Sequence, residues 1–312
     1  MDWIMRSFKI CCATRFARNY SRGFTLIEVL AVITIIGLLA SAAFVALGNA
    51  RKYFLNVGPK MRLNEVAKAL EMYKQKFGEY PPDCCATKSE IQRHILKRWP
   101  KVLKTGKITD MRDFASDEMQ RTPSSALLFW LAGPPEEAPG GELIYPGFCA
   151  DSLDPFGLNS GDLDSEPREE PLIELAFASD GKSGNYNNDG LVADGQVMAY
   201  FRSYARNGSL FEQSKFQTHA EDGYGGKDFH WKDGDVVAPY MKKGRWYNPD
   251  SYQLILNGQD GKFGVEPYSE GVHDEDQELP RDVADLESSI TESDWDNITN
   301  FTDGATLESE RE

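Results

Sequence analysis

The stretch RGFTLIEVLAVITIIGLLASAAFVAL, which runs from Arg22 to Leu47, governs how the rest of the chain is interpreted. Its last 24 residues begin at Phe24, and Glu28 is the only charged residue among them. An α-helix rises about 1.5 Å per residue, so about 20 apolar residues cross the core of a bilayer. The stretch therefore predicts a transmembrane helix over residues 24–48.

Glu28 is unusual within this apolar stretch, because a carboxylate in lipid costs at least about 2.5–3.5 kcal/mol. A cut after Gly23 would create an α-amine on Phe24, a cation at nearly the same depth. The amine of a neighbouring subunit would then neutralise Glu28 where helices pack side by side. The alternative is a glutamate that reaches the membrane interface and has no role.

Residues 1–23, which precede the apolar stretch, are basic, with five Lys or Arg and one Asp. A secretory signal peptide is a competing interpretation, but its apolar part spans only about 7–15 residues and ends at a small-residue cleavage site. Here Gly23 lies before an apolar stretch that continues into an amphipathic pattern. We therefore expect residues 1–23 to be a cleaved leader and the apolar helix to be kept.

The sequence RGFTLIE at residues 22–28 resembles the class III prepilin signal shared by type IV pilins and the pseudopilins of type II secretion systems. The resemblance implies that prepilin peptidase cuts after Gly23 and N-methylates Phe24. It also implies that Glu28 sets the register of subunits in a filament. Many members of the family carry a proline about two-thirds along the apolar helix, where this chain has Val45.

The composition of the 312-residue chain is that of a water-soluble body with a local anchor, since 27% of the residues are charged and the mean hydropathy is -0.48. The formal net charge is -15, whereas binding to a nucleic-acid backbone requires clustered Lys and Arg. We therefore expect no nucleic-acid partner. The acidic residues are concentrated at the C-terminal end, where residues 265–312 hold 16 Asp or Glu and two Arg.

An amphipathic stem helix is predicted over residues 49–80. Apolar residues recur there near the helical spacing, at Met61, Val66, Ala69, Leu70, Tyr73 and Phe77. Gly78 stands where a C-cap glycine would, and Pro81-Pro82 forbids continuation. Pro59 is expected to kink or break the helix.

Four further segments resemble parts of the major pseudopilins. They are AKALEMYKQKFGEYPP at the end of the stem, DPFG at 154–157, YQLILNGQDGKFG at 252–264 and DNITNF at 296–301. Helical signals lie in SEIQRHILKRW and SSALLFWLA, and strand signals in LIELAFASD, QVMAYFRSY, LILNG and DVVAPYM.

The predicted fold class is α+β, with a long N-terminal transmembrane and stem helix packed on a small antiparallel β-sheet. A periplasmic globular domain is expected over 81–312. It carries insertions at about 84–143 and 166–247 and ends in a long acidic C-terminal loop region.

The loop after residue 256 is the first candidate for a metal. Calcium takes six to eight oxygen ligands from carboxylates, amides, carbonyls and water. The resemblance to major pseudopilins implies a calcium ion here, and Asp260, Asp296 and Asn297 are the residues that match best. The alternative is an acidic, solvated tail.

A weaker second candidate is the stretch 180–196, where Asn185, Asn187 and Asp189 occupy positions 1, 3 and 5 of an EF-hand-like loop. The closing Glu of such a loop is absent, because Gln196 stands at position 12. A turn-rich hairpin loop is the alternative interpretation.

The body beyond the leader contains three of the five cysteines, Cys84, Cys85 and Cys149. No C-x-x-C spacing is present, which argues against a zinc site. In an oxidising compartment one disulfide between Cys149 and either Cys84 or Cys85 is expected; the alternative is three thiols.

The sequence contains no G-x-S-x-G elbow or Walker-type phosphate loop, and none of the four histidines has a paired metal-ligand spacing. We therefore expect a structural protein and not an enzyme. The resemblance implies a single-pass inner-membrane pseudopilin with its C-terminal domain in the periplasm. Its expected partners are other pseudopilins, prepilin peptidase, the inner-membrane secretion platform and the lipid bilayer. A type IV pilus or competence pilin is the alternative, and a membrane-anchored binding protein is a third class.

Overall fold

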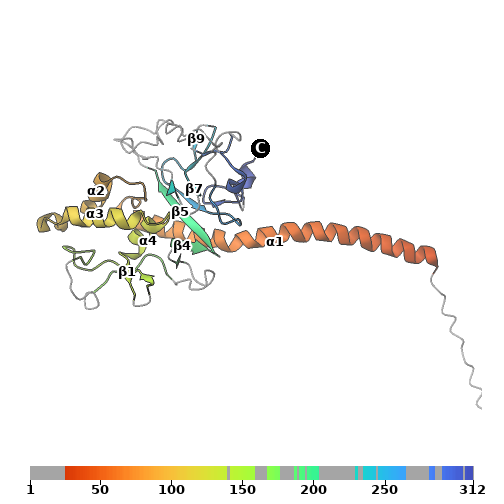
Figure 1. Cartoon of the computed structure of the whole chain (residues 1–312), viewed down its shortest axis with the longest axis horizontal. Helices are drawn as coiled ribbons and strands as arrows, with labels where there is room; N and C mark the ends of the chain where they lie inside the picture. Colours follow the sequence, from red (N-terminus) through yellow and green to blue (C-terminus); the bar gives the residue numbers. More distant parts are fainter. Residues whose placement is uncertain are drawn as a thin grey trace, which may run out of the picture. The chain divides into compact units, whose positions relative to one another are not determined.

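The computed structural model describes residues 25–138, 141–158, 167–175, 186–187, 190–193, 195–203, 229–230, 235–243, 245–264, 281–284, 290–304 and 306–311. The chain divides into two units, Met1–Arg51 and Lys52–Glu312. The α-helices labelled in Figure 1 are α1 Leu26–Phe77, α2 Lys88–Arg98, α3 Ile108–Met119 and α4 Ser125–Ala132. Short 3₁₀ helices are η1 Pro100–Thr105, η4 Glu292–Asp294 and η5 Leu307–Glu310.

The strands all belong to the second unit and most are short. They are β1 Glu136–Glu137, β2 Leu143–Ile144, β3 Tyr186–Asn187, β4 Gly190–Ala193, β5 Gln196–Arg202, β6 Phe229–His230, β7 Val236–Val237, β8 Tyr240–Lys242, β9 Arg245–Trp246, β10 Tyr252–Leu256, β11 Arg281–Asp282 and β12 Ile298–Thr299.

Helix α1 is a continuous helix of 52 residues. The segment predicted over 24–48 is confirmed as helix from Leu26 on. The helix ends as the sequence predicts, because Gly78 adopts a φ of +81° and its N–H donates to the Lys74 carbonyl at 2.7 Å. Of the two effects expected of Pro59, a break does not occur, because α1 continues through this residue. Pro inside a helix costs about 3 kcal/mol, and the buried side chains of the following turns each contribute about 1.5–3 kcal/mol.

A five-stranded sheet lies at the centre of the second unit, with the strand order β12-β10-β5-β4-β3 and each neighbouring pair antiparallel. Strand β10 pairs with β5 along its whole length, from Tyr252 opposite Arg202 to Leu256 opposite Met198. The small antiparallel sheet that the sequence predicts is confirmed.

Both faces of this sheet are covered, as the alternation along β5 shows. Met198 and Tyr200 belong to one hydrophobic cluster, whereas Val197, Ala199 and Phe201 belong to another. Successive side chains of a strand point to opposite faces. The second unit therefore has a hydrophobic layer on each side of its sheet.

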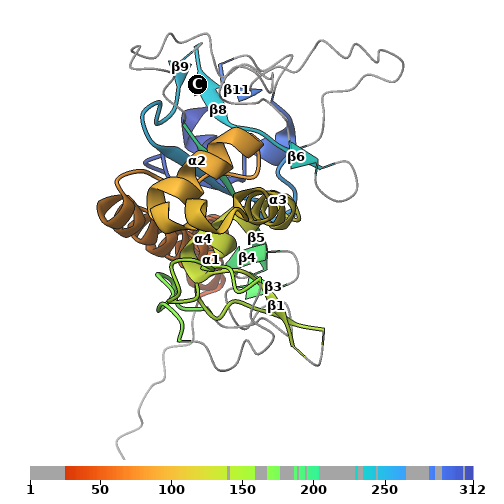
Figure 2. The ribbon, with the colours of Figure 1, turned by 90° about the vertical axis from the view of Figure 1, so that its left-hand side faces the viewer.

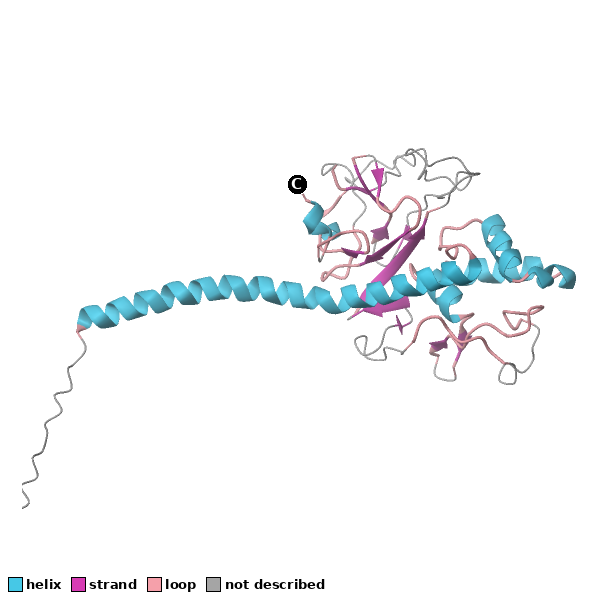
Figure 3. Ribbon diagram, turned by 180° about the vertical axis from the view of Figure 1, so that it is seen from behind, coloured by secondary structure: helices cyan, strands magenta, loops and turns pink. Residues whose placement is uncertain are grey.

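The first face is covered by the C-terminal part of α1 together with α2, α3 and α4 (Figure 2). Figure 3 shows the long strands running across this part of α1. On α1, Leu63, Val66, Leu70 and Tyr73 are at most 2% exposed, and they follow the helical spacing. The predicted stripe is wrong at Met61, which is 62% exposed, because Leu63 and not Met61 lies on the buried face.

The insertion predicted over about 84–143 is helical, and α2 and α4 lie on the two segments expected from the sequence. A capping box starts α2, in which the Thr87 hydroxyl accepts from the Glu90 N–H at 3.3 Å and the Glu90 carboxylate accepts from the Thr87 N–H at 2.9 Å. Helix α3 is not among the predicted elements. Its sequence signal is the buried series Met111, Ala115 and Met119, which recurs every four residues.

Strands predicted in QVMAYFRSY and LILNG are confirmed as β5 and β10, and DVVAPYM contains β7 and β8. The strand predicted in LIELAFASD is wrong over residues 172–175, which form no strand. There the Leu172 N–H donates to the Leu131 carbonyl at the end of α4, at 2.7 Å. The rest of that segment lies outside the described residues.

The second face of the sheet is covered by β8, β9 and the C-terminal segment. Val283, Ile290, Trp295 and Leu307 are buried there, each at most 9% exposed. The described part of the acidic C-terminal region contains only short elements, as expected of a loop region. This region nevertheless contributes side chains to the hydrophobic core. Its acidic composition gives no indication of this role.

Replacing Leu70 with alanine is expected to lower the free energy of unfolding by about 2–5 kcal/mol, because the side chain is fully buried between α1 and the sheet. Urea unfolding of the full-length protein in detergent measures this. Met72→Ala is the matched control, since Met72 is 52% exposed on the same helix, and it should change the free energy by no more than about 0.5 kcal/mol. Equal losses in both variants would contradict this packing.

Candidate functional site

The N-terminal end of α1 is organised by Thr25 and Glu28. The Thr25 N–H and hydroxyl both donate to Glu28 Oε2 at 2.8 Å, and the Glu28 N–H donates to the Thr25 hydroxyl at 3.3 Å. This reciprocal pattern is a capping box, and it keeps a carboxylate at the positive end of the helix dipole. The predicted cleavage and methylation residues Gly23 and Phe24 lie outside the described residues.

The capping role of Glu28 was missed by reasoning from the sequence alone. Its signal is present, because Thr25-x-x-Glu28 directly before an apolar run is the sequence signature of a capping box. Glu28 thus has a local structural role whatever else it does. An experiment on its charge must therefore preserve the cap.

The apolar side chains that follow are exposed around the whole helix. Ten of them are at least 49% exposed: Leu26, Ile27, Val29, Leu30, Val32, Ile33, Ile35, Ile36, Leu38 and Leu39. A helix that is apolar on every side belongs in a hydrophobic surrounding, either lipid or other helices. Within the described part of the chain, no helix meets the combined length and hydropathy required of a membrane span.

The first metal candidate brings two predicted residues together. The Asp260 N–H donates to Asp296 Oδ2 at 3.2 Å. Gly258 permits this arrangement, because a Cβ at that position would lie 1.8 Å from Asp296 Oδ1. Burial raises the pKa of Asp296, and the charge of Asp260 acts in the same direction.

Two oxygen atoms beside this contact are buried without a hydrogen-bond partner, Asp296 Oδ1 and Asn297 Oδ1. The amide nitrogen of Asn297 is occupied, since it donates to the Phe263 carbonyl at 2.6 Å and to the Tyr240 hydroxyl at 2.8 Å. Its carbonyl oxygen is thereby fixed in orientation. Among the described residues, no group of three or more His, Cys, Asp or Glu could hold a metal ion.

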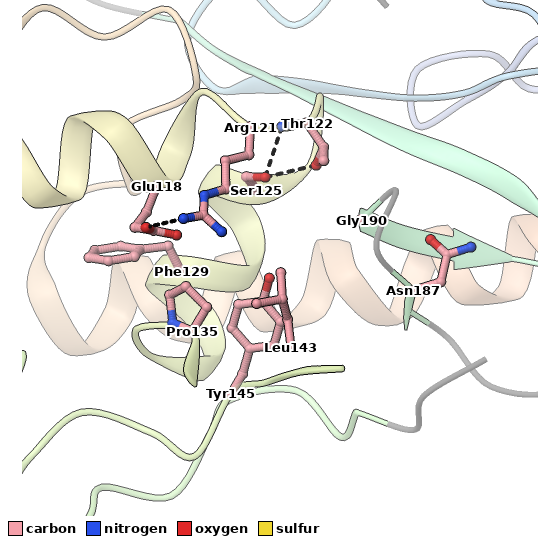
Figure 4. Close-up of a pocket in the computed structure, with 10 residues that line it drawn as sticks. All are labelled: Glu118, Arg121, Thr122, Ser125, Phe129, Pro135, Leu143, Tyr145, Asn187 and Gly190. Carbon is pink, nitrogen blue, oxygen red and sulfur yellow. Dashed lines mark hydrogen bonds and ion pairs between the residues drawn. The ribbon is translucent and has the colours of Figure 1, made fainter. Parts of the chain in front are cut away.

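The second metal candidate is only partly described, because Asn185 and Asp189 lie outside the described residues. Asn187 belongs to β3, where it pairs with Gly190. It lines a cavity of about 30 Å³ together with Glu118, Arg121 and Tyr145 (Figure 4). A cavity of this size holds one or two water molecules and no larger ligand.

A buried polar network joins α1 to α2 around His94, which is 1% exposed. His94 Nε2 lies 2.7 Å from the Tyr73 hydroxyl and Nδ1 lies 2.8 Å from Glu79 Oε1. A neutral imidazole satisfies both bonds, with Nδ1–H donating to Glu79 and Nε2 accepting from Tyr73. Burial accordingly lowers the pKa of His94 to about 4. Both ring nitrogens are used, so His94 serves the fold.

Cys84, Cys85 and Cys149 are thiols in the structure. This corresponds to the second of the two alternatives drawn from the sequence. Cys84 Sγ and Cys85 Sγ, which are neighbours in the chain, lie 3.8 Å apart.

Comparison with known proteins finds a sequence motif in the N-terminal region. Residues 18–44 match the prokaryotic N-terminal methylation motif. This is a type IV pilin-like, class III signal, and it spans Gly23, Phe24 and Glu28. The motif implies processing by prepilin peptidase, methylation, assembly with other pilin-like subunits and a membrane-anchored N-terminus. The pilin-like family that carries this motif is structural and not enzymatic. No curated protein and no solved structure matches the chain.

Because His94 is neutral in the fold, its contribution to the stability of the protein should fall in mild acid. The unfolded state binds a proton to His94 below pH about 6.5, whereas the folded state binds it only near pH 4. The contribution of this group to the free energy of unfolding should fall by about 3 kcal/mol across this window. Chemical denaturation at a series of pH values measures the change.

The matched variant is His94→Gln, whose amide can still bond to Tyr73 and Glu79. Asp83 titrates with the opposite sign, because burial raises its pKa to about 7. Asp83 contributes equally to both proteins, so the difference between wild type and variant reports on His94 and its bond with Glu79. If the free energies of unfolding of the two proteins change in parallel between pH 6.5 and 4, His94 is not neutral in the fold.

Proposed function

We propose that the protein is a structural pseudopilin of a type II secretion system. In this proposal its leader is removed after Gly23, Phe24 is methylated, and the apolar helix anchors it in the inner membrane with the body in the periplasm. Subunits then assemble, on an inner-membrane secretion platform and with other pseudopilins, into a filament that drives protein export. The observation that carries the proposal is the N-terminal methylation motif at residues 18–44.

The geometry at the start of α1 supports an assembly role. The capping box holds the Glu28 carboxylate at the first turn of the helix, and the predicted Phe24 amine is four residues earlier in the sequence. In a lone subunit the carboxylate keeps its charge among apolar side chains, with only helix N–H groups and a hydroxyl to offset it. The methylated amine of a neighbouring subunit supplies the missing cation. Assembly is thereby favoured in one register, in which each Glu28 meets one amine.

The exposed apolar surface supports the same proposal. Side chains from Leu26 to Leu39 are exposed on all sides of the helix. One surface of this kind serves two surroundings, since lipid covers it in the membrane and neighbouring helices cover it in a filament. A type IV pilus or competence subunit is the alternative, because type IV pilins share the signal. Deletion of the gene distinguishes the two functions. It would abolish protein export if the protein is a pseudopilin, and piliation or DNA uptake if it is a type IV pilus or competence subunit.

Glu28→Gln is the sharpest test of assembly. Glutamine preserves the capping box and removes the charge. The variant should be processed and inserted like the wild type, but cross-linked oligomers should fall by more than tenfold, because the lost pairing is worth at least about 2.5 kcal/mol in lipid. Quantitative cross-linking in membranes measures this. Thr25→Val, which weakens the cap and keeps the charge, is the matched control.

If Glu28→Gln assembles like the wild type while Thr25→Val does not, Glu28 acts as a cap and not as a charge partner. That result would overturn the assembly mechanism.

The resemblance to major pseudopilins suggests calcium binding beside Asp296, and this binding is part of the proposal. Two observations support a hard cation at this position: two buried oxygens lack hydrogen-bond partners, and Gly258 leaves room for the carboxylate. Asp296, Asn297 and Asp260 would hold the ion, with carbonyl or water oxygens completing the set. A bound Ca²⁺ would offset the repulsion between two neighbouring carboxylates and tie the C-terminal segment to the loop after β10.

Calcium should therefore stabilise the wild-type protein and not Asp296→Asn. At a free Ca²⁺ concentration one hundred times the Kd, linkage predicts about 2.7 kcal/mol of added stability. Thermal unfolding in Ca²⁺ and in chelator measures the difference. Asp250→Asn, at an exposed position outside this loop, is the control and should respond like the wild type. An equal response in wild type and Asp296→Asn would exclude this site.

A further inference from the structure

Cys84 and Cys85 occupy the two central positions of a tight turn between α1 and α2. The turn is closed by the Ala86 N–H, which donates to the Asp83 carbonyl at 3.2 Å. The Cys85 N–H donates to the Asp83 side chain at 3.1 Å. Within this turn the two sulfur atoms lie 3.8 Å apart, so both side chains point to the same side.

The turn is held in place from three directions. Asp83 is fully buried, and its second carboxylate oxygen accepts from the Arg202 N–H of β5 at 2.8 Å. The Tyr200 hydroxyl of the same strand donates to the Pro81 carbonyl at 2.7 Å. On the other side, the capping box at Thr87 starts α2. The two thiols are therefore brought together by the fold and not by chance rotation of free side chains.

The two thiols differ in access to solvent. Cys84 is 5% exposed, whereas Cys85 is only partly buried. A thiol exchange reaction needs one accessible sulfur to meet the oxidant and a second one nearby to resolve the mixed disulfide. This pair meets both requirements, with Cys85 as the accessible thiol and Cys84 as the resolving thiol.

We propose that Cys84 and Cys85 form a reversible vicinal disulfide. Cys85 attacks a low-molecular-weight or protein disulfide and releases one thiol, and Cys84 then attacks the mixed disulfide and releases the second. The two S–H bonds of the protein are replaced by one S–S bond, the two electrons reduce the oxidising disulfide, and the two protons pass to the released thiols. Its occurrence in the cell rests on the proposed function, because an exported body meets an oxidising compartment.

Reversibility follows from the spacing of adjacent residues. Neighbouring Cα atoms are about 3.8 Å apart across a trans peptide, whereas disulfides prefer a Cα separation of about 4.4–6.8 Å. A bond between neighbours is therefore strained and more readily reduced than an unstrained structural one. The turn would act as a redox-sensitive modification site at the junction of α1, α2 and the sheet.

The test uses the purified full-length protein in detergent, equilibrated with mixtures of glutathione and glutathione disulfide. Thiols are trapped with N-ethylmaleimide in denaturant, so that the buried Cys84 and Cys149 also react, and tryptic peptides are identified by mass. The peptide 77–88 contains both cysteines and should become two hydrogens lighter and lose both alkylations as the mixture becomes oxidising. Cys149 should stay alkylated throughout. The oxidised peptide should persist in Cys149→Ser and disappear in Cys85→Ser.

Three results would overturn the proposal: peptide 77–88 linked to the peptide that contains Cys149, glutathione carried stably on Cys85, or both thiols alkylated in every mixture. Because the assay supplies its own oxidant, a negative result speaks against the vicinal bond alone. The proposed processing after Gly23 is tested independently by the N-terminus of the protein.

Discussion

The surface of α1 between Leu26 and Leu39 sets the central physical constraint on this protein. Large apolar side chains are exposed there around the whole helix. Full burial of such a side chain is worth about 1.5–3 kcal/mol, so the free energy of covering ten of them is comparable with the stability of an ordinary domain. The first unit is therefore built for a hydrophobic surrounding. This part of the helix lies within residues 18–44, which match the prokaryotic N-terminal methylation motif.

The same helix changes its character beyond Pro59. From Leu63 on, one face is buried against the five-stranded sheet, and most of the other positions are polar. A single helix thus serves two roles, since its first part is suited to lipid and partner helices and its last part is a core element of the body. The bonds of His94 with Tyr73 and Glu79 add a polar connection between this helix and α2.

Local patterns in the sequence predicted the elements whose signals are contained within a few residues. Gly78 and the prolines after it marked the end of α1, and the alternation in β5 and β10 marked the sheet. The pairing of distant segments was beyond such signals. Arg281 and Asp294 form a buried ion pair, and Asp235 accepts from the Phe263 and Gly264 N–H groups. Nothing local distinguishes these charges from the acidic residues around them, so the sequence alone predicted an acidic loop region where the structure has a second hydrophobic cluster.

The candidate functional residues also differ in how readily the sequence predicts them. The motif around Gly23, Phe24 and Glu28 is readable because its residues are consecutive, whereas the calcium proposal depends on residues 36 positions apart. The proposed pairing of Glu28 requires a processed N-terminus, so N-terminal peptide mapping of the protein from native membranes is the decisive measurement. The expected result is a chain that begins at N-methylated Phe24. A mature chain that retains Met1 to Gly23 would leave Glu28 without its amine, and the proposed assembly mechanism would be wrong.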